Sequence, residues 1–74
     1  MPETEVFQTN VTNRRTAAAL LRCLQAQFPT WHITFDLDDC DRVLRVASLD
    51  GPLDAPAVAT VLQARGYRCV PLPD

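Results

Sequence analysis

The chain contains no lysine, only two glycines, one histidine and one methionine among its 74 residues. Its three cysteines form no Cys-x-x-Cys pair, and their odd number excludes a fully paired disulfide framework. The longest apolar run, residues 17–21, is far too short to cross a bilayer. We therefore expect reduced thiols and no membrane partner.

The chain carries a small negative net charge. All seven basic residues are arginines, they are scattered along the chain, and the formal net charge is −2. A nucleic-acid surface usually gathers Lys and Arg in excess on one face, so this charge argues against it. The first residues, MPETEV, are acidic where a signal peptide is basic and then apolar. We expect a cytoplasmic protein that does not bind nucleic acid.

The pattern of apolar residues predicts a single domain, residues 1–74, built from six elements. A hydrophobic fraction of 47% and a charged fraction of 22% are typical of a globular domain. Period-two alternation predicts strands over residues 5–11, 31–37, 43–48 and 67–72. Spacings of three and four predict helices over residues 13–27 and between Asp54 and Gly66.

The order of the elements is βαββαβ, which predicts an α+β, ferredoxin-like fold. Right-handed crossovers place both helices on one face of a four-stranded antiparallel sheet. Pro71 confines the last strand to an edge, because proline has no N–H to donate to a ladder. The strand in "WHITFDL", residues 31–37, is also an edge, and its backbone groups could extend a partner's sheet.

Several spacings carry a family resemblance. Leu20 and Leu24 follow Asn13 by seven and eleven positions. "FDL" closes the second strand at Phe35 to Leu37, and "ARGY" closes the second helix at Ala64 to Tyr67. This layout resembles the heavy-metal-associated (HMA) domain, the family of small copper chaperones and of the N-terminal modules of copper and zinc pumping ATPases.

The resemblance covers nearly the whole chain, but the metal-binding motif of the family is absent. It implies that Val11 stands where the family has Met of Met-x-Cys-x-x-Cys, and that Asn13 and Thr16 stand at the two cysteine positions. It also implies that Tyr67 lies in the loop that follows the second helix. Thiolates hold Cu(I), and thiolates, imidazoles or carboxylates hold zinc, whereas an amide and a hydroxyl bind neither ion usefully. We expect no metal site and no cofactor at these positions.

The loop that replaces the motif could still bind an anion or a partner. Thr12, Asn13, Arg14, Arg15 and Thr16 surround a predicted helix N-terminus, where free amides favour negative charge. The simpler interpretation is two solvated arginines beside an ordinary helix cap.

The cysteines and the histidine offer an alternative, a Cu or Zn carrier with unconventional ligands. Cys40 lies among Asp36, Asp38, Asp39 and Asp41 in a predicted turn, and Cys69 could join His32. Cys23 falls three positions after Leu20, so we expect an inert core thiol there.

The leading hypothesis is a non-catalytic binding module that acts through a protein partner or through self-association. No Ser or Cys nucleophile stands in a recognisable local pattern with a histidine and a carboxylate, so we expect no enzymatic activity.

Overall fold

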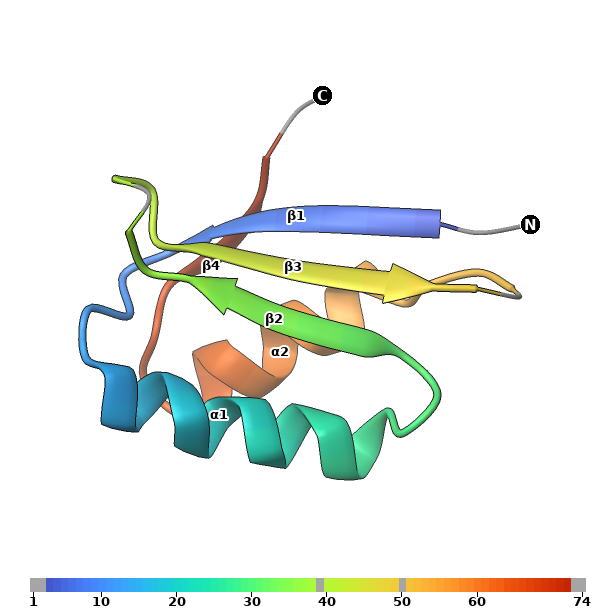
Figure 1. Cartoon of the computed structure of the whole chain (residues 1–74), viewed down its shortest axis with the longest axis horizontal. Helices are drawn as coiled ribbons and strands as arrows, with labels where there is room; N and C mark the ends of the chain where they lie inside the picture. Colours follow the sequence, from blue (N-terminus) through green and yellow to red (C-terminus); the bar gives the residue numbers. More distant parts are fainter. Residues whose placement is uncertain (1–2, 39, 50, 73–74) are drawn as a thin grey trace.

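The computed structural model describes residues 3–38, 40–49 and 51–72. The elements are β1 (Glu3–Thr9), α1 (Arg14–Gln27), β2 (His32–Asp36), β3 (Val43–Ser48), α2 (Ala55–Ala64) and β4 (Cys69–Pro71). The strands form one antiparallel sheet in the order β2-β3-β1-β4, and both helices lie on the same face of it (Figure 1). The predicted α+β, ferredoxin-like fold is confirmed. Asp39 of the acidic turn, and the first two residues of the acidic N-terminal segment, lie outside the described residues.

The core lies between the sheet and the helices. Phe7 in β1 and Leu44 in β3 are cross-strand partners, and both are completely buried. Thr9 and Val11 share the helix-facing side with Phe7, as the alternation predicts. The core cluster consists of Phe7, Val11, Ala17, Leu20, Leu24, Ile33, Leu44, Val46, Val58, Leu62 and Cys69.

The helices begin and end where the sequence predicts, because local polar groups satisfy their backbone ends. The Asn13 side chain caps α1, and Asp54 Oδ1 accepts a hydrogen bond of 3.1 Å from Ala57 N at the start of α2. Such caps typically stabilise a helix by about 1 kcal/mol. Gly66 follows α2 with φ +88°, the left-handed conformation that glycine adopts without steric cost.

The strand boundaries differ from the prediction, most clearly in β4. The prediction began this strand at Tyr67, but Tyr67 N donates to Leu62 O (3.0 Å) and so closes α2. Arg68 N donates to Asn10 Oδ1 (2.8 Å) in the β1–α1 connection. Both amides are therefore used outside the sheet, and β4 is only three residues long.

Candidate functional site

The β1–α1 loop is organised around the Asn13 side chain. Asn13 Oδ1 accepts hydrogen bonds from Arg15 N (2.7 Å) and Thr16 N (3.3 Å). These are first-turn amides, the groups that an anion at a helix N-terminus would bind. The position that the resemblance equates with a metal-binding cysteine therefore acts as a helix cap, and its side chain occupies two of the backbone donors of the predicted anion loop.

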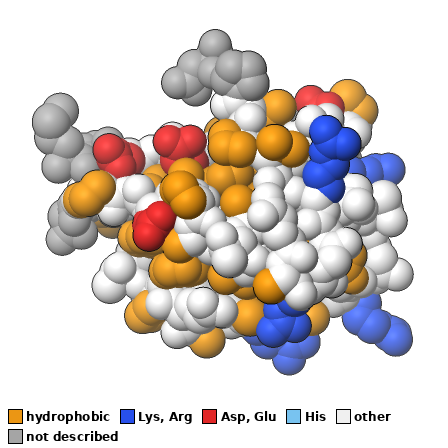
Figure 2. All heavy atoms as spheres, turned by 180° about the vertical axis from the view of Figure 1, so that it is seen from behind, with side chains coloured by type: hydrophobic (Ala, Val, Ile, Leu, Met, Phe, Trp, Pro, Cys, Tyr) orange, Lys and Arg blue, Asp and Glu red, His pale blue; other side chains and the backbone are white. Residues whose placement is uncertain are grey.

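One side of this loop meets the connection between α2 and β4. Arg15, Thr16, Arg65 and Tyr67 line a hollow of about 330 Å³, together with Ala19 and Leu20. Thr16 and Tyr67 are therefore neighbours, although 50 residues separate them in the chain, which the topology requires because both connections lie at the same end of the sheet. In Figure 2, arginine side chains lie toward the right of the view, which is the end of the molecule that carries the β1–α1 loop in Figure 1.

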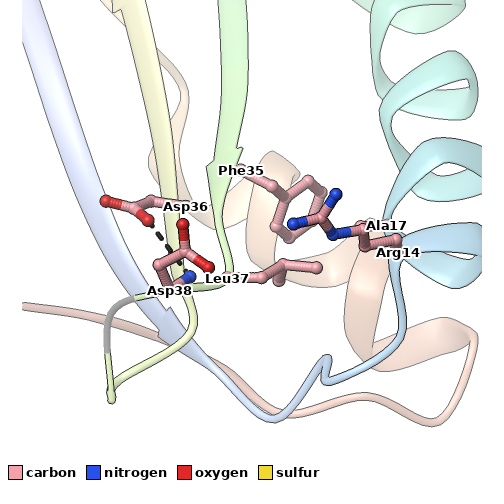
Figure 3. A pocket seen from close by; sticks show the side chains of 6 residues that line it. All are labelled: Arg14, Ala17, Phe35, Asp36, Leu37 and Asp38. Atoms are coloured by element: carbon pink, nitrogen blue, oxygen red, sulfur yellow. Dashed lines mark hydrogen bonds between the residues drawn. The ribbon is translucent and has the colours of Figure 1, made fainter.

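Arg14 lies on the other side of α1, toward β2. It lines a second hollow, of about 270 Å³, with Ala17, Phe35, Asp36, Leu37 and Asp38 (Figure 3). The floor of this hollow is apolar and its rim carries both signs of charge. The two neighbouring arginines of the loop therefore point to different surfaces. Sequence reasoning missed this hollow, because its existence depends on how α1 is rotated against β2.

The edge strand β2 forms the wall of the second hollow. Within the described part of the chain it pairs only with β3, from His32↔Ala47 to Asp36↔Val43 without a break in register. Ile33 is buried beneath α1, and Phe35 is half-buried beside it. His32 and Asp36 are exposed on the face that no helix covers. The predicted edge position of this strand is confirmed.

The segment between α1 and β2 is attached to the end of α1 by a ring contact and two hydrogen bonds. The rings of Phe28 and Trp31 stack with centroids 4.4 Å apart and an angle of 13° between their planes. Gln25 Nε2 donates to both Phe28 O (3.2 Å) and Trp31 O (2.7 Å). The edge strand is therefore attached to α1 through Trp31, the residue that precedes it, and this attachment reduces the ordering that is required when the strand pairs with another strand.

The three cysteines occupy different environments. Cys40 is exposed and Cys69 is buried, whereas Cys23 is half-buried. The prediction that Cys23 is a core thiol is wrong. It lies beside the buried stripe of α1, where its Sγ accepts from Arg65 Nη2 (3.1 Å) and from Gln27 Nε2 (3.6 Å). The rotation of α1 brings Leu20 and Leu24 onto the sheet and turns Cys23 toward α2.

Those groups considered as unconventional metal ligands that the structure describes do not converge. Within residues 3–38, 40–49 and 51–72, no cluster of three or more His, Cys, Asp or Glu side chains could hold a metal ion. His32 lies on the uncovered face of one edge strand, and Cys69 lies on the helix-facing side of the other. Cys40 follows the far end of β2, so the strand length of roughly 13 Å separates it from His32.

Burial raises the pKa of the Cys69 thiol from 9.0 to about 11. The thiolate is the form that binds metals and reacts, so this shift disfavours both roles. The folded state binds the proton more tightly than the unfolded state does. This contribution to stability is therefore complete below about pH 9, and we expect it to disappear as the pH rises through 9 to 11. Urea unfolding at a series of pH values measures the change.

Comparison with two cysteine variants isolates this contribution. The fall in stability should persist in Cys40→Ala, where the changed thiol is exposed, and should become smaller in Cys69→Ala. Alkylation offers a second measurement, because iodoacetamide at pH 8 should modify Cys40 and spare Cys69 until the protein is unfolded. Equal pH dependence in the two variants would contradict the assignment.

Comparison with protein families, with characterised proteins and with solved structures finds no match to this chain. Neither described helix has the length and apolar character that crossing a membrane requires.

Proposed function

We propose that the protein is a non-catalytic binding module that recognises an extended protein strand along the outer edge of β2. The strand comes from a partner protein or from a second copy. The scaffold is similar to the HMA domain in layout, and its Asn13 and Thr16 leave it without the soft-metal ligands of that family. The observation that carries the proposal is the edge position of β2, which among the described strands has β3 on one side and none on the other.

The surroundings of this edge support strand addition as the binding mode. In that mode, backbone hydrogen bonds supply affinity, and pockets beside the strand read alternate side chains. The hollow lined by Arg14, Phe35 and Leu37 lies directly beside the end of β2 (Figure 3). An apolar side chain fits its floor, and the mixed charges at its rim provide selectivity.

Photocrosslinking in cells of the native host tests this proposal. A benzophenone side chain replaces Thr34 in the middle of β2, and the control carries the same group in place of Ala26, which is exposed on α1. We expect position 34, and not position 26, to give adducts of defined mass that mass spectrometry identifies as protein. An absence of adducts at position 34, or the same adducts from both positions, would overturn the proposal.

A further inference from the structure

The two edges of the sheet differ in how well they are protected against pairing. β4 has only three residues, and one of them is Pro71. β2 has five residues and continuous register, and it contains none of the proline, lysine or bulge devices that usually block an exposed edge. An edge without such protection favours pairing with another strand.

We propose that β2 pairs with β2 of a second copy, antiparallel and centred on Thr34, so that two sheets join into one. This inference rests on the proposed function and names the partner. The sequence of β2, HITFD, is complementary to itself in this register. His32 lies opposite Asp36 of the other copy, Ile33 lies opposite Phe35, and Thr34 lies opposite Thr34. The interface is isologous, with the same patch contributed twice.

Charge and side-chain type favour this register of the β2–β2 pair over other registers. Registers that place His32 opposite His32, or Asp36 opposite Asp36, set like groups against each other, which destabilises a strand pair. If the register shifts by one residue, each helix-facing side chain of one copy pairs with a residue from the uncovered face of the other copy. Asp36 Oδ1 accepts from Asp38 N (3.2 Å), so Oδ2 remains for the imidazole of the second copy.

The side chains beside β2 are also compatible with a two-fold pairing centred on Thr34. A two-fold axis through Thr34 keeps the helices of both copies on one side of the joined sheet, because paired residues of antiparallel strands share a face. Beside this edge lie apolar side chains of α1, of the α1–β2 connection and of β2 with the residue after it, which are only partly buried in the single copy, namely Leu21, Phe28, Trp31, Phe35 and Leu37. Pairing brings these side chains of the two copies close together, and the apolar surface that they bury adds to the strand hydrogen bonds.

Sedimentation velocity over a wide concentration range tests the pairing. We expect the mass of the wild-type protein to rise from 8.2 kDa toward twice that value as concentration increases. His32→Asp places carboxylates opposite each other at both ends of the pairing, and Asp36→His places imidazoles there. Because each end of the interface is changed, we expect either variant to dimerise about tenfold more weakly or worse. Ala26→Asp, an exposed change on α1, should dimerise like the wild type.

A mixture of the two β2 variants provides the decisive measurement. Each variant alone sets like groups in opposition, whereas the mixture sets acid against imidazole at both ends. We expect the mixture to recover dimerisation, and thermal melts confirm that each variant is folded. A wild-type protein that stays monomeric at millimolar concentration would overturn the self-pairing, as would a mixture that associates no better than its components.

The outcomes separate this inference from the proposed function. If the wild type is monomeric while position 34 crosslinks to another protein in cells, the self-pairing is overturned and the strand-recognition module stands. If position 34 gives no adduct in cells and the wild type is monomeric in solution, both are overturned.

Discussion

Replacement of Phe7 with alanine is expected to remove a large share of the free energy of unfolding of the protein, about 3–5 kcal/mol. Phe7 is fully buried in β1, between β3 and β4, and it packs under both helices as part of the core cluster. Removing a buried phenylalanine side chain typically costs about 3–5 kcal/mol. At roughly 0.05–0.15 kcal/mol per residue, the total stability of a 74-residue chain is about 4–11 kcal/mol. Urea unfolding followed by circular dichroism measures the loss.

The matched control for Phe7→Ala is Leu49→Ala. Leu49 is 82% exposed at the end of β3, so its truncation leaves no cavity. We expect the free energy of unfolding to change by no more than about 0.5 kcal/mol. A loss below about 1 kcal/mol for Phe7→Ala would contradict the position of Phe7 at the centre of the core.

Thr9→Val is expected to cost about 2–4 kcal/mol, although it preserves size and shape. The Thr9 hydroxyl donates to Arg42 O (2.6 Å) and accepts from Val11 N (3.2 Å), and the residue is 5% exposed. Valine leaves the buried Val11 N and the part-buried Arg42 O without this partner. An unsatisfied buried group costs about 1–3 kcal/mol, and the part-buried carbonyl costs less because water can reach it. Arg42 has φ +50°, an unfavourable conformation that the hydrogen bond helps to hold. Thermal and urea unfolding give the change in stability.

Thr9→Ser separates the hydroxyl from the methyl group. Serine keeps both hydrogen bonds and loses one buried methyl group, so we expect a cost of about 1 kcal/mol. If serine and valine destabilised the protein equally, the hydroxyl would have no structural role. Amide exchange of Val11 gives a second measurement, because its N–H should exchange faster in the valine variant than in the serine variant.

The element types could be predicted because they depend on neighbours in the sequence. The three- and four-residue spacing of Ala17, Leu20, Leu21, Leu24 and Phe28 predicts one buried face of α1. Ala17, Leu20 and Leu24 are buried, whereas Leu21 and Phe28 are only partly buried. Asp54 and Gly66 mark the two ends of α2 through a cap and a left-handed turn. The edge position of β2 follows from the ferredoxin-like order of the strands, once the four strands are recognised.

The ends of β4 and the environment of Cys23 could not be predicted, because both depend on contacts between distant segments. Tyr67 and Arg68 continue the strand pattern, but their amides bind Leu62 and Asn10. Cys23 has the spacing of a core residue, and a small difference in helix rotation turns it toward Arg65. Periodicity locates a helical face to within about one residue, since consecutive residues differ by about 100°.

The sequence by itself determined which segments are helix and strand, where the helices are capped, and that no cysteine stands at positions 13 and 16. These properties depend on local backbone preferences and side-chain chemistry. The tertiary structure decided which side chains meet. It separated Arg14 from Arg15 on two sides of α1, and it brought the Thr9 hydroxyl to Arg42, 33 residues away. The physical reason is that such contacts depend on the rotation of α1 against the sheet and on the register between strands, which the whole core determines together.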